Sequence, residues 1–110
     1  MILADDLIWS TRLAQAVTAA GGVPVGIRRL EDLFAGLAEA RHAIVDLTSR
    51  AYDPLRAVAE AGARARVIAV GQHDDAATRK AAIAAGAEHV YPYRKLFEDG
   101  PAVIRAWLEG

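Results

Sequence analysis

The sequence contains no cysteine, which excludes disulfide bridges and metal sites built on thiolates. Its longest apolar runs, such as residues 67–71, are far shorter than the roughly 20 residues that a membrane-spanning helix needs. The first residues meet acidic side chains at once and no basic segment precedes them, so they do not resemble a signal peptide. The formal net charge of −1 gives no electrostatic basis for binding nucleic acid. These absences predict a cytoplasmic protein that binds neither membranes nor nucleic acid.

The composition suits one domain with a sizeable core. The chain has 110 residues, the usual size of a single domain, and this leaves no room for a second core. Hydrophobic residues make up 54% of the chain and charged residues 25%, which excludes a disordered tail. We therefore expect a single domain that covers residues 1–110.

Short aliphatic runs alternate with longer stretches of helical period, which is the pattern of a parallel sheet covered by helices on both faces. The expected strands are residues 1–4, 23–27, 42–46, 66–70 and 87–91. The expected helices are residues 7–20, 30–40 and 53–61, a fourth helix that Asp74 or Asp75 caps and that runs to residue 85, and a last helix that begins around residues 99–101. Short connections and right-handed crossovers then predict a doubly wound (βα)5 parallel sheet with strand order 2-1-3-4-5. Two helices would cover one face and three the other.

The residues that follow the strands are the candidates for function, because ligands of an open parallel sheet bind beyond the carboxyl ends of its strands. Asp5 and Asp6 follow the first strand and Asp46 ends the third, so these three carboxylates would converge in one acidic pocket. The residues after the fourth and fifth strands would form the rim of this pocket: Gly71, Gln72, Tyr93 and Lys95.

Each acidic residue also has a purely structural explanation. Asp5 and Asp6 suit the N-cap and first turn of the helix that follows them, where the helix dipole favours negative charge. Asp46 suits the capping of the loop at residues 47–49. Both interpretations stay open at the level of the sequence.

A chain of this length and element order, with an aspartate pair after the first strand and an aspartate ending the third, resembles the receiver domain of two-component response regulators. The local sequences VIAVGQHDD and AAGAEHVYPY are also similar to that family, and the resemblance covers essentially the whole chain. It implies the flavodoxin- or CheY-like form of the α/β fold. In the family the acidic pair holds Mg²⁺ and the third-strand aspartate accepts a phosphoryl group, which implies Asp5 and Asp6 as the pair and Asp46 as the acceptor. Asp6 and Asp46 are then the candidate ligands for Mg²⁺, and no other cofactor is expected.

The sequence departs from the family at two positions that matter for phosphoryl chemistry. Receivers carry a threonine or serine at the end of the fourth strand, where this chain has Gly71. They also carry a lysine before a proline at the end of the fifth strand; counting along the chain puts Tyr93 there, and anchoring on the proline puts Tyr91 there. Lys95 lies nearby but matches neither alignment. Because a transferring phosphoryl group needs fixed donors and positive charge, we expect inefficient phosphorylation.

The sequence therefore predicts a pseudo-receiver, a non-enzymatic signalling module that keeps the receiver scaffold and acts by protein–protein binding. The resemblance implies that it binds a partner, or itself, through the face formed by the fourth helix, the fifth strand and the fifth helix. The basic side chains expected on that face are Arg79, Lys80, Arg94, Lys95 and Arg105. One alternative is an atypical phosphoacceptor that uses Asp46 with Mg²⁺. Another is a small flavodoxin-like ligand-binding module or enzyme, which is disfavoured because no nucleophile–base pair follows the strands.

Overall fold

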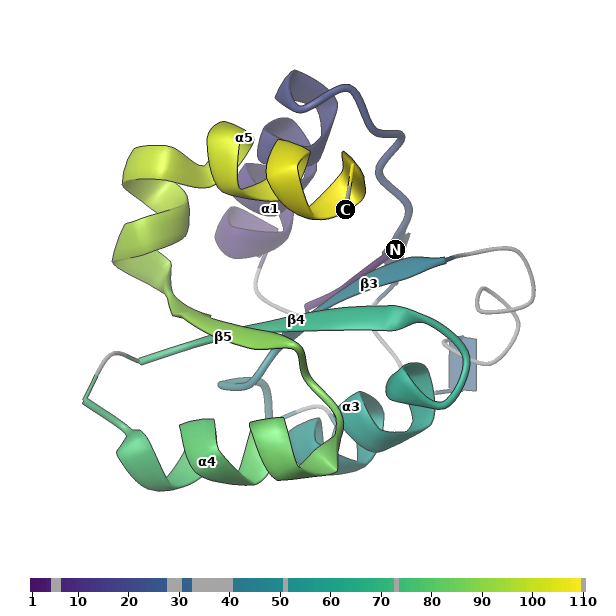
Figure 1. Cartoon of the computed structure of the whole chain (residues 1–110), viewed down its shortest axis with the longest axis vertical. Coiled ribbons are helices and arrows are strands. Elements are labelled where there is room, and N and C mark those ends of the chain that lie inside the picture. The colour runs from purple at the N-terminus through teal and green to yellow at the C-terminus, as the bar shows by residue number, and fades with distance from the viewer. Residues whose placement is uncertain (5–6, 28–30, 33–40, 51, 73, 110) are drawn as a thin grey trace.

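Five parallel strands form the centre of the computed structural model, which describes residues 1–4, 7–27, 31–32, 41–50, 52–72 and 74–109. The strands are β1 (Ile2–Leu3), β2 (Gly26–Ile27), β3 (His42–Asp46), β4 (Arg66–Gly71) and β5 (His89–Pro92). Their spatial order is β2-β1-β3-β4-β5, and every neighbouring pair is parallel (Figure 1). The predicted topology of the sheet is confirmed.

Helices cover both faces of this sheet (Figure 1). The helices α1 (Leu7–Ala19) and α5 (Tyr93–Glu109) lie on one face, and α3 (Pro54–Gly62) and α4 (Ala76–Ala85) lie on the other. The predicted helix at residues 30–40 falls mostly outside the described residues, so the expected split of two helices against three stays a prediction. Within the described part of the chain, no helix is long and apolar enough to cross a membrane.

The central strands divide the core into two layers, because successive side chains of a strand point to opposite faces of the sheet. On the side of α1 and α5, Ile44, Ile68 and Val70 belong to one buried cluster. On the side of α3 and α4, Val67 and Ala69 belong to a second buried cluster. Burial on both faces explains why these strands read as uninterrupted aliphatic runs in the sequence.

The predicted bounds of the strands hold for β3, differ by one residue for β4, and shift for β1, β2 and β5. Strand β3 has the predicted bounds, whereas the predicted strand at residues 23–27 shortens to the two residues of β2. Val23 and Val25, which precede β2, are 85% and 52% exposed. An edge strand has a single neighbour, so fewer hydrogen bonds and less burial fix its ends.

The helix α5 consists of two helical segments joined at a kink. The kink lies at Asp99, whose φ of −124° and ψ of 16° are not helical. The second segment begins after Asp99, where the sequence predicts the last helix, and Pro101 suits its first turn because a proline there removes no helical hydrogen bond. The first segment, which begins at Tyr93, was not predicted. It packs on the sheet, because Leu96 is buried.

Asp53 caps the amino terminus of α3, as the sequence predicts, and Pro54 takes the first helical position. The Asp53 carboxylate accepts hydrogen bonds from the backbone N–H groups of Leu55 (3.1 Å) and Arg56 (3.3 Å).

We expect Asp53→Ala to lower the free energy of unfolding by about 1 kcal/mol, because these N–H groups lose their partner. Denaturant unfolding followed by circular dichroism measures the loss. The matched control is Asp74→Ala, since Asp74 is exposed and makes no hydrogen bond within the described residues; equal losses in both variants would contradict the capping role.

Candidate functional site

Asp46 is the buried polar residue at the carboxyl end of β3. Its residue surface is only 1% exposed, although it ends a strand at the edge where ligands of such sheets bind. Its Oδ1 atom accepts hydrogen bonds from the backbone N–H of Thr48 (3.0 Å) and from the Thr48 hydroxyl (2.9 Å). The carboxylate therefore caps the turn that follows β3, as the structural explanation of Asp46 requires.

The hydroxyl of Tyr93 donates a hydrogen bond to the same Oδ1 atom of Asp46. It also lies 2.5 Å from the Thr48 hydroxyl, so the three side chains form one hydrogen-bonded cluster. Tyr93 reaches this position because it is the first residue of α5 and directly follows β5. The ring of Trp9 on α1 covers it, with the ring centroids 4.1 Å apart. The cluster thus joins the ends of β3 and β5 beneath an aromatic cover.

The second carboxylate oxygen of Asp46 has a different environment. Oδ2 is buried and has no hydrogen-bond partner among the described residues. A buried acceptor without a donor is costly, so this atom is the position at which a proton, a donor or a cation would bind. Asp5 and Asp6, the other predicted carboxylates of the acidic pocket, lie outside the described residues. Within the described part, no group of three or more histidines or carboxylates could hold a metal ion.

Gly71 and Gln72 lie where the sequence predicts the rim of the pocket. Together with Leu47 and Thr48 they line a small cavity of about 20 Å³, which has the size of one water molecule. A Cβ atom at Gly71 would lie 3.5 Å from Leu47 Cδ1, which is ordinary van der Waals contact. Crowding does not force a glycine at this position, so a residue with a hydroxyl could be accommodated there.

Tyr52 and Thr48 are parts of this site that the sequence interpretation missed. The Tyr52 hydroxyl is buried between the carbonyl oxygens of Asp46 (2.6 Å) and Leu3 (2.9 Å), and it can donate to one of them at a time. It thereby links the carboxyl ends of β3 and β1. Thr48 could have been found, because a hydroxyl two residues after an aspartate is typical of a capped turn. Tyr52 gives no such local signal, since its contact with Leu3 spans 49 residues.

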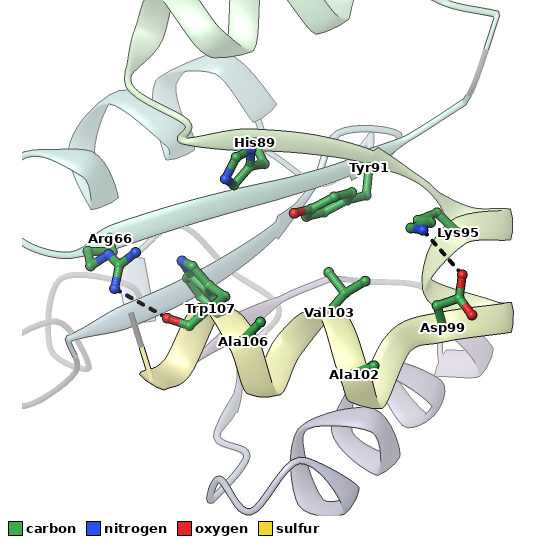
Figure 2. Close-up of a pocket in the computed structure, with 9 residues that line it drawn as sticks. All are labelled: Arg66, His89, Tyr91, Lys95, Asp99, Ala102, Val103, Ala106 and Trp107. Atoms are coloured by element: carbon green, nitrogen blue, oxygen red, sulfur yellow. Dashed lines mark hydrogen bonds and ion pairs between the residues drawn. The ribbon is translucent and has the colours of Figure 1, made fainter.

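A second feature is a groove of about 560 Å³ between β5 and α5 (Figure 2). Its lining combines apolar, aromatic and charged side chains: Arg66, His89, Tyr91, Lys95, Asp99, Ala102, Val103, Ala106 and Trp107. Lys95 was predicted for the rim of the acidic pocket, but its ammonium group pairs with Asp99 in this groove, 3.2 Å away (Figure 2). The structure therefore does not use Lys95 in place of the lysine that receivers carry.

The fold is shared with solved receiver domains. The BeF3-activated DrrB receiver domain has a TM-score of 0.80 and 18% identity, over 99% of this chain and 95% of that one. A response regulator from Burkholderia pseudomallei, solved with a phosphorylated aspartic acid, calcium ion and citrate, has a TM-score of 0.71 and 17% identity over 83% of this chain. NtrX from Brucella abortus has a TM-score of 0.75 and 16% identity over 96% of this chain.

Two of these proteins are longer than the present chain, which spans 56% of the Burkholderia protein and 26% of NtrX. No protein-family model and no curated protein sequence matches the chain. At these identities the likeness establishes a CheY-like receiver fold, and function has to be argued from the chemistry of the site.

The contact between Tyr93 and Asp46 can be tested by removing one oxygen atom. We expect Tyr93→Phe to lower the free energy of unfolding by about 1 kcal/mol, because the Asp46 carboxylate loses a donor. Tyr91→Phe is the matched control, since the Tyr91 hydroxyl makes no hydrogen bond within the described residues. Urea unfolding of the three proteins provides the comparison. Equal stability of both variants would show that the Tyr93 hydroxyl does not hold Asp46.

Proposed function

We propose that this chain is a receiver-like regulatory module that works by binding protein, and that its acceptor-position aspartate is held by an internal hydrogen bond instead of being phosphorylated. The observation that carries the proposal is the Tyr93 hydroxyl on Asp46 Oδ1. Counting along the chain puts Tyr93 at the position of the receiver lysine, whereas anchoring on the proline puts Tyr91 there. A neutral phenol group therefore occupies the place of an ammonium group.

The chemistry of phosphoryl transfer supports this proposal. A transferring phosphoryl group carries charge on its peripheral oxygens, and catalysis depends on cations and fixed donors placed around them. Tyr93 brings no positive charge, and Gly71 offers no hydroxyl at the end of β4. Oδ1 of Asp46 is already held by hydrogen bonds from Thr48 and Tyr93, which leaves Oδ2 as the oxygen that could attack. The missing positive charge and the missing hydroxyl are therefore the features that we expect to lower the rate at which Asp46 reacts.

One observation favours a second candidate, an atypical phosphoacceptor that uses Asp46 with Mg²⁺. The Oδ2 atom of Asp46 is buried without a partner among the described residues, so it could face a cation. Carboxylate oxygens are the ligands that Mg²⁺ prefers in proteins. The two candidates differ in whether Asp46 forms an acyl phosphate.

Incubation with acetyl phosphate and Mg²⁺ separates the two candidates. We expect little or no aspartyl phosphate on Asp46, measured by intact-protein mass spectrometry at acidic pH. Stoichiometric labelling that disappears in Asp46→Asn would reject the pseudo-receiver and establish the phosphoacceptor. The double variant Gly71→Thr/Tyr93→Lys serves as the positive control, because it returns the hydroxyl and the ammonium group to the positions discussed above. Increased labelling of this variant on Asp46 would show that these two side chains are what the natural site lacks.

The binding face of the proposed module combines α4, β5 and α5. Lys80 and Arg94 are exposed on it, and Ile83 is an exposed apolar side chain at 51%. Arg105 was predicted for this face, but its guanidinium donates to the carbonyl oxygen of Ala19 at the end of α1 (3.1 Å) and so lies toward α1. The groove beside Tyr91 adds a hollow in which a partner's side chain could be buried (Figure 2).

Charge reversal on this face should weaken partner binding. The natural chain and the double variant Lys80→Glu/Arg94→Glu are each used to capture proteins from host extract. We expect the variant to retain much less protein, because the charges at the rim of an interface must complement those of the partner. Arg50→Glu/Arg56→Glu makes the same charge change in and before α3, which is not one of the three elements of this face, and should retain binding. Quantitative mass spectrometry of the retained proteins measures the difference. Equal retention by both double variants would move the binding surface away from α4, β5 and α5.

A further inference from the structure

The opposite end of the sheet carries a basic hollow that neither the receiver fold nor the proposed function explains. It has a volume of about 450 Å³ and lies at the amino-terminal ends of β3 and β4. Three guanidinium groups, an imidazole and one carboxylate contribute to its lining, which consists of Arg41, His42, Gly62, Arg64, Ala65, Arg66, Leu108 and Glu109. Positive charge therefore exceeds negative charge among the described side chains that line this hollow.

The side chain of Arg66 is held in one position in the lining of the hollow. Its guanidinium makes two hydrogen bonds to the Glu88 carboxylate, at 2.7 and 3.1 Å, and a third to the Trp107 carbonyl oxygen at 3.2 Å. The indole N–H of Trp107 also donates to Glu88, at 3.1 Å. This network joins β4, the start of β5 and the end of α5, so the side chain of Arg66 is held in place before any ligand arrives.

Arg41 and Arg64 have no comparable partners. Both side chains are exposed, and neither guanidinium group makes a hydrogen bond or an ion pair within the described residues. Arginines at this end of the sheet can have a simpler role, since helices end here with unpaired carbonyl groups that cations satisfy. Arg66 and Arg105 fill that role with the carbonyls of Trp107 and Ala19. The donors of Arg41 and Arg64 are left for a ligand.

His42 contributes the imidazole ring in the lining of the hollow. Its carbonyl accepts from the amino-terminal ammonium group of Met1 at 3.0 Å, and its ring meets Trp107 edge-on at 4.8 Å. Its Nε2 atom is buried and has no hydrogen-bond partner among the described residues. This ring nitrogen belongs to a lining that contains three arginines, and no group among the described residues forms a hydrogen bond with it.

Several groups around His42 act on its protonation. Burial is the largest cause that lowers the pKa of the imidazole below its ordinary value, and the positive charges of Arg66 and the Met1 amino group lower it further. Glu88 opposes this shift, and Arg41 adds a smaller decrease. Cations thus outweigh the neighbouring carboxylate at the imidazole, which agrees with the charges that line the hollow.

We propose that this hollow binds a small oxyanion with two or more negative charges, of the chemical class of a phosphate monoester or a diphosphate. Guanidinium groups donate pairs of hydrogen bonds that match the geometry of such oxygens. Arg66 is fixed in the lining by its bonds to Glu88 and Trp107, and the guanidinium groups of Arg41 and Arg64 provide donors that can close around the ligand. The site lies at the far end of β3 from Asp46, so it does not depend on whether Asp46 is phosphorylated.

The test is a titration of the full chain with inorganic phosphate and, separately, with pyrophosphate, at pH 8 and constant ionic strength set with sodium chloride. We expect a saturable rise in melting temperature, because a ligand that binds only the folded state stabilises it. The pKa of His42, followed by NMR of its imidazole, should rise with added anion, since nearby negative charge favours the protonated ring.

The double variant Arg41→Gln/Arg64→Gln should weaken anion binding at least roughly tenfold, because two charged donors are lost. Lys80→Gln/Arg94→Gln removes the same charge elsewhere and should bind like the natural chain. All four positions are exposed, and circular dichroism verifies the fold of each variant. A shift that does not saturate, that is equal in both double variants, or that leaves the pKa of His42 unchanged would overturn the proposal.

Discussion

All five strands run in the same direction, and the arrangement of charges in this protein follows from that constraint. In a parallel sheet with crossover helices, the carboxyl ends of the strands and the amino ends of the helices share one edge. The helix dipoles make that edge favourable for acids and the opposite edge favourable for bases. Asp46 and the capping residues Asp53 and Asp75 lie at the first edge, and Arg66 and Arg105 bind helix carbonyls at the second.

At the carboxyl edge of the sheet, the side chains around Asp46 contact one another. Thr48 and Tyr93 satisfy Oδ1 of Asp46, Tyr52 lies against the Asp46 carbonyl, and Trp9 covers the ring of Tyr93. A lysine at the position of Tyr93 would bring a charge that attracts an anion to the carboxylate. The phenol instead satisfies the carboxylate with a neutral hydrogen bond, which also fixes the first turn of α5. The start of the helix that borders the proposed binding face is therefore tied to β3 without any added group.

The sequence was sufficient where local chemistry decides the structure. The bounds of β3, the Asp53–Pro54 cap of α3 and the order of the strands follow from aliphatic runs, cap residues and short right-handed connections. It did not predict the first segment of α5, which begins at Tyr93 and precedes the kink at Asp99. Pro101 correctly indicates the first turn of the second segment, but no local signal showed that another helical segment comes before it. The contacts of Asp46 with Tyr93 span 47 residues, so residue spacing could place Tyr93 near the site but could not show which group it binds.

Because the fold itself favours acids at one edge and bases at the other, a charged cluster at either edge is weak evidence for a ligand. The stronger evidence is bonding capacity that remains after the fold has been satisfied. Glu88 shows the distinction, because its carboxylate is used by Arg66 and Trp107, and these bonds hold its pKa below the ordinary value for glutamate. The partners of Arg66 are internal in the same way. Oδ2 of Asp46 at one edge and the guanidinium groups of Arg41 and Arg64 at the other have no such partners among the described residues, and these are the atoms at which a ligand gains hydrogen bonds that the protein does not already make.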